Sequence, residues 1–394
     1  INFSSKDHES REASEGGLQR YEIPYQTFRK YHGGRSPESV LILGAGSGND
    51  AFVALKNGAK RIVAVEIDPV ILKIGQNLHW QRPYSDPAVQ LINDDGRHYL
   101  RTTKERFDLV IFGTLDSQTL LAGNSNLRLE NYIYTSECFS DVARVLREGG
   151  MVGAYYSIFK PWLTGRLFAT IHAAFPGAVR YVEFEDRYLF NLVIMGAKGI
   201  PEFRSTQESL LKFLSIEPLS DDWPFIYLEE RTISPLYQGV LLFFAMLAFA
   251  VFNFLRRDQG VEWRQLAFFF LGVGFTLVES AAVARLALLF GAVWIVSAIV
   301  FFTALFMVFL ANLSVWYRIA ISQRVAWAGL LLLLLGNYLV SIEWLLSFGT
   351  PLRLLLCFGL VGLPVYFSGI CFSTLFEQER NMGSALGLNL VGAM

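Results

Sequence analysis

The chain has 394 residues and a net charge of -1, from 34 Lys and Arg against 35 Asp and Glu. This balance lacks the basic excess of a nucleic-acid-binding protein, so no nucleic acid partner is expected. Hydrophobic residues make up 53% of the sequence, and they divide it near Pro235 into a mixed, charged part and a part with long apolar runs.

The first element that the sequence predicts is a polar segment at residues 1–20, which we interpret as a linker or mobile arm. Residues 21–31 follow with four aromatic side chains and Pro24. This aromatic segment either covers a ligand site or packs on a sheet, and Tyr25 within it is a candidate substrate residue. The α/β domain is expected to span residues 21–200.

Three alternating glycines, Gly44, Gly46 and Gly48, follow the apolar run at residues 40–43. A helical stretch comes next, and the second apolar run ends in Glu66. This pattern predicts a βαβ nucleotide-binding unit, in which glycines allow close approach of the ligand and an acidic strand end accepts hydrogen bonds from ribose hydroxyls. The GxGxG spacing differs from the GxGxxG dinucleotide fingerprint and favours the S-adenosylmethionine type of fold.

Apolar runs and helix-like stretches continue to alternate through the first half of the chain. They predict a fold of the α/β class with a seven-stranded Rossmann-like methyltransferase sheet, whose last two strands form an antiparallel hairpin. The expected strands are 39–44, 61–66, 89–93, 107–112, 150–156, 179–185 and 188–196, with helices from about 49 and at 69–80, 96–103, 136–147 and 161–174.

Polar residues follow the third and fourth predicted strands. Asp95 suits the amino group of an adenine and Gly96 suits its ring nitrogen, although Asp95 is also a good helix N-cap. Asp116 follows the fourth strand and is the candidate general base. The long loop after it supplies further substrate candidates, because loops at this edge of a sheet often bind ligands: Gln118, Arg128, Tyr132 and Tyr134. The three cysteines, Cys138, Cys357 and Cys371, lack metal-site spacing, so no metal is expected.

The α/β half resembles the spermidine/spermine synthase family. The resemblance rests on residues 40–150, with Glu66-Ile67-Asp68, Asp95-Gly96, Phe107-Asp108-Leu109-Val110-Ile111 and Leu146-Arg147-Glu148-Gly149-Gly150, and it covers most of residues 21–198. It implies that Glu66 binds the ribose and Asp95 the adenine of S-adenosylmethionine or a related adenosyl-sulfonium compound.

Two departures from the family's motifs weaken the case for aminopropyl transfer. Ser47 stands where the GGxDGG motif has the aspartate that holds the aminopropyl amine. Gly113 stands where the DSxDP motif has the carboxylate that deprotonates the attacking amine. Residues 78–84, 115–121 and 128–135 are closer to a bacterial group of spermidine-synthase-like proteins with fused transmembrane helices.

The second half of the chain predicts an all-α transmembrane bundle at residues 236–394, after a linker at 201–235. At least five apolar segments are long enough to span a bilayer: about 236–255, 266–286, 291–316, 325–346 and 354–376. A sixth begins near 385, and both chain ends look truncated. Glu279 is a candidate polar site inside the second span, because an intramembrane carboxylate is costly and usually functional.

The leading hypothesis is a membrane-anchored S-adenosylmethionine-dependent transferase, a methyltransferase acting on a small-molecule, membrane-associated or lipid-like substrate. The alternatives are a non-catalytic subunit of a larger membrane complex, an aminopropyltransferase disfavoured by Ser47 and Gly113, and a transporter with an adenosyl-sensing domain. The expected partners are the lipid bilayer and either other membrane subunits or further copies of the chain.

The expected location is the bacterial inner membrane, with the α/β domain in the cytoplasm where the donor is made. The distribution of Arg residues along the second half contradicts this orientation, because the orientation places most of them outside, whereas the positive-inside rule expects them on the cytoplasmic side.

Overall fold

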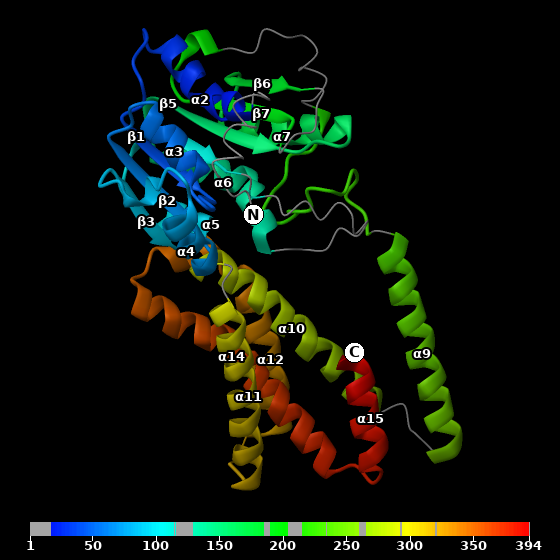
Figure 1. Cartoon of the computed structure of the whole chain (residues 1–394). Helices are drawn as coiled ribbons and strands as arrows, with labels where there is room; N and C mark the ends of the chain where they lie inside the picture. The colour runs from blue at the N-terminus through cyan, green and yellow to red at the C-terminus, as the bar shows by residue number, and fades with distance from the viewer. Residues whose placement is uncertain are drawn as a thin grey trace. The chain divides into compact units, whose positions relative to one another are not determined.

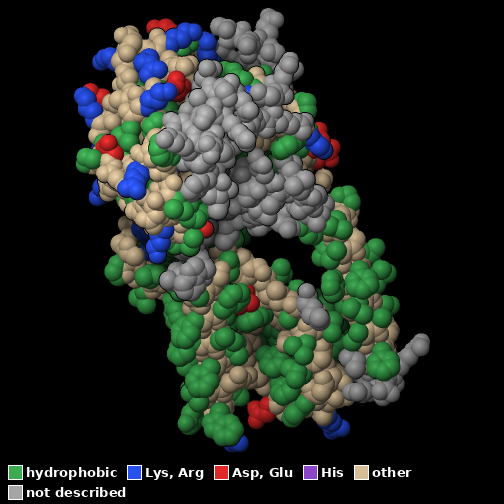
Figure 2. Space-filling model, viewed as in Figure 1, with side chains coloured by type: hydrophobic (Ala, Val, Ile, Leu, Met, Phe, Trp, Pro, Cys, Tyr) green, Lys and Arg blue, Asp and Glu red, His purple; other side chains and the backbone are tan. Residues whose placement is uncertain are grey.

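A computed structural model describes residues 17–113, 115, 129–184, 190–203, 215–233, 235–259, 265–291, 294–319 and 321–393. The chain divides into two compact units, Ile1–Thr232 and Ile233–Met394. Figure 2 shows charged side chains over the first unit and apolar side chains along the helices of the second. This contrast matches the change in composition near Pro235.

The first unit is built on a seven-stranded sheet with the order β3-β2-β1-β4-β5-β7-β6 (Figure 1). β1 to β5 run parallel, and β7 pairs antiparallel with both β5 and β6. The predicted methyltransferase-type sheet with its antiparallel edge is therefore confirmed. The strands are β1 (Ser39–Leu43), β2 (Arg61–Glu66), β3 (Val89–Asn93), β4 (Phe107–Phe112), β5 (Leu146–Tyr156), β6 (Val179–Glu183) and β7 (Leu192–Ala197).

Helices cover both faces of this sheet, because the buried parallel strands carry apolar side chains on each side. Val40 and Ile42 belong to the apolar core with α2 and α3, whereas Leu41 and Leu43 belong to the core with α5, α6 and α7. The helices are α2 (Gly17–Tyr31), α3 (Asn49–Lys56), α4 (Pro69–Leu78), α5 (Gly96–Thr102), α6 (Ser136–Val145) and α7 (Pro161–Ala174), with short 3-10 turns η1 (Pro83–Ser85), η3 (Leu129–Tyr134) and η4 (Pro201–Phe203).

Several predicted boundaries are wrong by a few residues. The helix expected to reach 147 ends at Val145, because Leu146 already pairs with Phe107 as the first residue of β5. The last two strands are shorter than expected. The stretch expected to be a linker, 201–235, places Phe203, Leu219 and Ile226 in the apolar core, so the described residues before Ile233 belong to the first unit.

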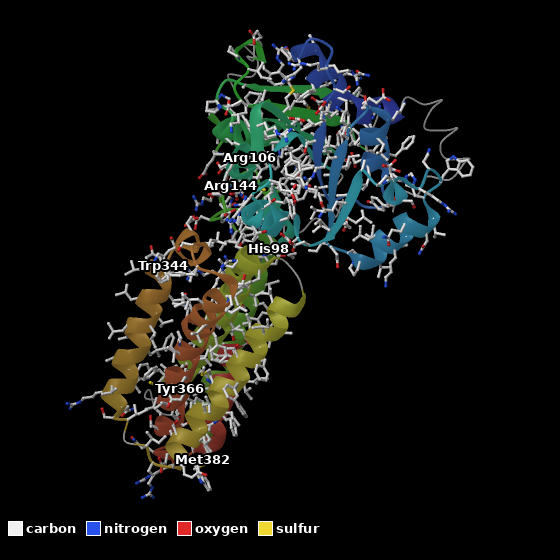
Figure 3. All side chains as sticks on the ribbon, turned by 90° about the vertical axis from the view of Figure 1, so that its left-hand side faces the viewer. His98, Arg106, Arg144, Trp344, Tyr366 and Met382 are labelled. Carbon is white, nitrogen blue, oxygen red and sulfur yellow. The ribbon has the colours of Figure 1, made fainter. Side chains whose placement is uncertain are left out.

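The second unit is helical. Among its described residues, four helices are long and apolar enough to span a membrane. These four lie within α9, α10, α11 and α14, and they agree with four of the five predicted spans. Figure 3 shows Trp344 and Met382 towards opposite ends of the unit, with Tyr366 between them. The helices are α9 (Pro235–Gln259), α10 (Leu266–Phe290), α11 (Trp294–Trp316), α12 (Gln323–Leu339), α13 (Ile342–Leu346), α14 (Thr350–Glu377) and α15 (Met382–Ala393).

Glycines allow α10 and α15 to approach closely. A Cβ atom on Gly272 would lie 2.2 Å from the carbonyl oxygen of Asn389, and one on Gly392 would lie 2.1 Å from that of Phe269. The Asn389 amide also donates to the carbonyl of Phe268 at 2.9 Å. Small residues and interhelical hydrogen bonds of this kind are typical of helix contacts inside membranes.

The predicted fourth span at 325–346 is wrong as a single helix. α12 ends at Leu339, and α13 starts again after Ser341, whose side chain accepts a hydrogen bond from the Trp344 backbone. Arg285 of α10 donates to the carbonyls of Asn337 and Val340, which satisfies acceptors that the end of α12 leaves open. Arg285 therefore caps α12. Glu279 lies in the middle of α10 and is half-buried.

Candidate functional site

The carboxyl ends of β3, β2, β1 and β4 lie next to one another in the sheet. Backbone hydrogen bonds extend the register past the strand ends, from Gly44 to Val65 at 2.9 Å and from Gly113 to Leu43 at 2.9 Å. The polar residues that follow these four strands therefore share one edge of the sheet, which is where ligands bind in folds of this type.

The loop after β1 adopts a conformation that favours glycine. Gly44, Gly46 and Gly48 have φ values of 70°, 55° and 113°, a region that side chains other than glycine rarely occupy. Among the atoms of the described residues, a Cβ atom on Gly46 would have only the Gly44 oxygen within 4.0 Å. These residues therefore leave open space beside Gly46, at the start of α3, where a ligand can approach the backbone.

Neighbouring side chains hold this loop in place. The Tyr84 hydroxyl is hydrogen-bonded to the carbonyls of Ala45 at 2.9 Å and Gly46 at 2.8 Å. His79 is buried, accepts from the Gln81 amide at Nδ1, and lies 3.1 Å through Nε2 from Oδ1 of Asn49. His79 is thus a structural support of the loop.

Glu66 is buried at the end of β2 beside the glycine loop. Its carboxylate accepts from the Gly46 amide at 2.9 Å and from the Asp68 amide at 3.0 Å, one to each oxygen. A carboxylate oxygen has a second lone pair. Glu66 therefore has a fixed orientation and retains the capacity to accept two hydrogen bonds from a diol.

Asp95 follows β3 and begins α5. Its carboxylate accepts from the His98 amide at 2.9 Å, so it is an N-cap. A Cβ atom on the next residue, Gly96, would lie 2.8 Å from the Ile133 side chain. The N-cap alternative for Asp95 is therefore confirmed.

Gly113, at the end of β4, has no room for a side chain. A Cβ atom there would lie 2.5 Å from the Gly44 carbonyl oxygen and 3.4 Å from Oδ2 of Asp50. The first contact is with backbone of the glycine loop, which has little freedom to move. The absence of a carboxylate at this position is thus a consequence of the close approach of the two strand ends.

Asp50 is a buried carboxyl that the sequence interpretation did not single out. It lies in the first turn of α3 and is only 7% exposed. Burial raises its pKa to about 7, and a hydrogen bond with Tyr155 partly offsets this rise. The sequence spacing places Asp50 on one helix face with the apolar residues Val53 and Ala54, but it does not indicate which face packs on the sheet.

The predicted substrate residues lie in different places. Tyr25 is buried on α2 in the core on one face of the sheet, whereas Tyr134 is in the core on the other face and packs edge-on against Tyr156. Tyr132 is also buried, which raises the pKa of its hydroxyl. The aromatic segment at 21–31 thus packs on the sheet. Three of the predicted residues, Asp116, Gln118 and Arg128, lie outside the described residues.

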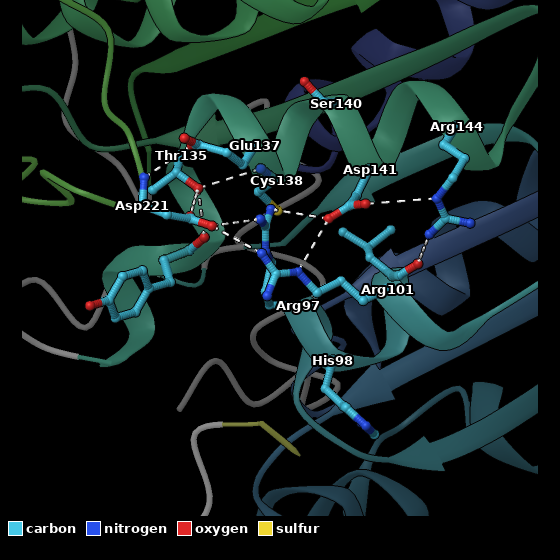
Figure 4. Close-up of polar contacts among 12 residues, drawn as sticks. Arg97, His98, Arg101, Thr135, Glu137, Cys138, Ser140, Asp141, Arg144 and Asp221 are labelled. Atoms are coloured by element: carbon cyan, nitrogen blue, oxygen red, sulfur yellow. Dashed lines mark hydrogen bonds and ion pairs between the residues drawn. The ribbon is translucent and has the colours of Figure 1, made fainter. Parts of the chain in front are cut away.

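A buried ionic cluster lies on the α5 and α6 side of the sheet (Figure 4). Asp221 accepts from Arg97 at 3.1 Å, from Arg101 at 3.0 Å and from the Thr135 hydroxyl at 2.6 Å. Asp141 lies 3.5 Å from both arginines. The cluster attaches the segment after residue 215 to the helices that carry Asp95 and Tyr132.

We expect Asp221→Ala to lower the free energy of unfolding of the first unit by about 3 to 5 kcal/mol, because it removes a carboxylate partner from two buried guanidinium groups. Denaturation in detergent, followed by near-ultraviolet circular dichroism, measures this change. Asp222→Ala is the matched control, since Asp222 pairs with Arg231 at the surface. Equal stability of the two variants would contradict the role of the cluster.

We expect Gly113→Asp to damage the site instead of restoring a carboxylate to it. The new Cβ atom would displace the Gly44 carbonyl and cost about 1 to 3 kcal/mol of stability, and ligand affinity would fall with the movement of the loop. Thermal unfolding and nucleoside binding measure both effects, with Asn77→Asp, at an exposed position of α4, as a control for added charge. A gain in activity with unchanged stability would contradict this.

A family model described as the spermine/spermidine synthase domain matches residues 29–189. One curated relative is the polyamine aminopropyltransferase of Thermoplasma volcanium, which is 32% identical over 33% of this chain and 43% of that protein. Another is polyamine aminopropyltransferase 1 of Pseudomonas aeruginosa, which is 33% identical over 29% of this chain and 38% of that protein. This chain therefore spans less than half the length of these relatives. The solved spermidine synthase of Thermotoga maritima is 20% identical, with a TM-score of 0.38, over 54% of this chain and 72% of that chain. With the sheet topology and the strand-end residues, the family match identifies residues 29–189 as a spermidine synthase-like domain.

Proposed function

We propose that the spermidine synthase-like domain binds an adenosyl-sulfonium donor and transfers an alkyl group from it to an amine. The observation that carries this proposal is the arrangement of the glycine loop, Glu66 and Asp95 on three adjacent parallel strands. An open position at Gly46, a fixed carboxylate and an N-cap carboxylate suit the ribose and adenine of such a donor.

Each group has a separate role in this proposal. Glu66 accepts hydrogen bonds from the two ribose hydroxyls, while its bonds to Gly46 and Asp68 keep it oriented. Asp95 accepts from the adenine amino group, and the Gly96 amide donates to a ring nitrogen. The donor supplies an activated carbon next to a cationic sulfur, so the protein contributes mainly position and electrostatic stabilisation.

One observation favours the aminopropyl group as the group transferred, because the curated relatives are named polyamine aminopropyltransferases. Methyl transfer is the second candidate, because Ser47 and Gly113 lack the carboxylates that the family's motifs place there.

We further propose that the domain is held at a bilayer by the second unit. Four of its helices are long and apolar enough to span a membrane, and cytoplasmic synthesis of the donor favours the cytoplasmic side of the bacterial inner membrane. The acceptor is then a small amine or a lipid-like molecule that carries an amine. A non-catalytic subunit of a membrane complex is the alternative.

Product analysis tests the proposal. The purified full-length chain in detergent is incubated with a diamine and either decarboxylated S-adenosylmethionine or S-adenosylmethionine, and the thioether product is identified by mass spectrometry. We expect 5′-methylthioadenosine from the first donor. S-adenosylhomocysteine from the second would favour methyl transfer, and the absence of both thioethers with every amine tried would favour the non-catalytic alternative.

A further inference from the structure

Asp50 reaches the same sheet edge as the proposed donor site from the first turn of α3. Its Oδ2 atom lies 3.4 Å from the Cβ position of Gly113, at the end of β4. The side chain is buried, so the position keeps a carboxyl group out of bulk water. Removal of a carboxylate from water is costly unless it is paired and hydrogen-bonded, so the burial of Asp50 needs an explanation.

Three tyrosines are the titratable groups that face Asp50 among the described residues: Tyr25 of α2, Tyr84 of η1 and Tyr155 of β5. Burial and the proximity of Asp50 raise the pKa of each of these hydroxyls, so they remain neutral. No Lys or Arg side chain within the described ranges contributes to the pKa of Asp50. Among the described residues, the carboxyl therefore faces hydroxyl groups and no fixed cation.

The Tyr155 hydroxyl has two neighbours for its single proton. It donates to the carbonyl of Tyr21 at 3.2 Å, and it is also hydrogen-bonded to Asp50. A protonated Asp50 donates a hydrogen bond to the Tyr155 oxygen, and the Tyr155 hydroxyl then donates its own hydrogen bond to the Tyr21 carbonyl. An ionised Asp50 instead accepts the Tyr155 proton. Both protonation states of Asp50 therefore have a hydrogen-bonded arrangement in the same structure.

The hydroxyl of Tyr25 adds a second polar group to this cluster. It is buried, and the structure gives it no hydrogen-bond partner among the described residues. An unpaired buried hydroxyl costs about 1 to 3 kcal/mol. A ligand group that bonds to it would recover this cost, so Tyr25 favours a polar acceptor close to Asp50.

We propose that Asp50 is the proton acceptor for the attacking amine, and that Tyr25 and Tyr155 orient it. This inference rests on the proposed transfer to an amine. An ammonium enters the site, and one N–H proton passes to the Asp50 carboxylate, which exposes the nitrogen lone pair. A new N–C bond forms as the C–S bond of the donor breaks, the bonding pair stays on sulfur, and the products are a neutral thioether and an alkylated ammonium.

The protonated carboxyl returns its proton to water after the products leave. Removal of the ammonium from water lowers its pKa, and burial raises the pKa of the Asp50 carboxyl to about 7. The two pKa values are therefore closer than in solution, which favours proton transfer between the groups. In this proposal Asp50 supplies the carboxylate next to position 113, where the close backbone of the glycine loop leaves no space for a side chain.

Asp50→Asn is the main test, because asparagine keeps the shape of the side chain and cannot accept the proton. We expect kcat for transfer from decarboxylated S-adenosylmethionine to a diamine to fall about 10²-fold to 10⁴-fold. The Kd of 5′-methylthioadenosine, which lacks the amine, is expected to stay within threefold. The wild-type chain is expected to lose kcat/KM as the pH falls through about 7, and the variant to lack this dependence.

Tyr155→Phe is the second variant and gives a readout that general damage would not produce. The hydrogen bond from Tyr155 lowers the pKa of Asp50, so its loss should move the acidic limb of the pH profile to higher pH. Tyr181→Phe, on the edge strand β6, is the matched control and should leave the limb in place.

The outcomes separate the two levels of the proposal. The wild-type chain could turn over while the kcat of Asp50→Asn stays within threefold of the wild-type value and its pH profile keeps the acidic limb. This result would overturn the role of Asp50 but not the proposed transfer reaction. A wild-type chain that neither binds nor consumes an adenosyl-sulfonium donor would overturn the proposed function, and this inference with it.

Discussion

Replacement of Glu66 by Ala is expected to weaken the binding of 5′-methylthioadenosine at least about a hundredfold. Each hydrogen bond from a ribose hydroxyl to a buried carboxylate contributes about 1.5 to 3 kcal/mol, and Glu66 offers one free lone pair to each hydroxyl. The substitution also removes the acceptor of the Gly46 and Asp68 amides, so the glycine loop loses its fixed position. Isothermal titration of the purified chain measures the change in Kd.

A matched control lies beside the opposite end of the same strand. Glu105, between α5 and β4, pairs with Arg61 at the start of β2, and both side chains are partly exposed. Glu105→Ala removes one negative charge from the first unit and should leave the Kd within about threefold, since exposed ion pairs contribute little. Equal affinities of the two variants would show that the nucleoside does not bind at the carboxyl end of β2.

The protonation of Asp50 is expected to make the stability of the first unit depend on pH. Burial raises its pKa in the folded chain from 3.8 to about 7, so the folded state holds a proton that the unfolded state has already released. The stabilising contribution is complete below about pH 4 and is lost as the pH rises through about 7. This rise in pKa corresponds to about 4 kcal/mol as an upper bound.

Asp50→Asn removes this dependence, because asparagine is neutral at every pH. We expect the difference in unfolding free energy between the variant and the wild-type chain to increase by about 2 kcal/mol between pH 5.5 and pH 8.5. Denaturation curves of the first unit at the two pH values measure it, with Asp222→Asn as an exposed carboxylate control. A difference that does not change with pH would contradict the raised pKa.

The strand pattern predicted the fold because the local sequence preferences in this domain agree with the tertiary structure. Glycine spacing, buried parallel strands and acidic strand ends follow from short-range sequence rules, and they placed Gly44, Glu66 and Asp95 at one sheet edge correctly. The helix N-cap role of Asp95 was also predictable, since an aspartate before a helical run commonly accepts from the third residue on.

Asp50 could not be assigned in the same way. Its burial depends on how α3 packs on the sheet, and its contact with the Gly113 position depends on the distance between β1 and β4, neither of which a linear motif describes. The break of the predicted 325–346 helix has a similar origin. Hydropathy alone indicated one span, whereas the N-cap at Ser341 and the Arg285 contact from another helix end α12 at Leu339.

The central claim is that the edge formed by the glycine loop, Glu66 and Asp95 binds an adenosyl nucleoside. The most direct test is calorimetric titration of the purified wild-type chain in detergent with 5′-methylthioadenosine. The account predicts one site with a Kd in the micromolar range, about −8 kcal/mol, that decarboxylated S-adenosylmethionine competes for. The absence of saturable binding up to millimolar nucleoside would contradict it.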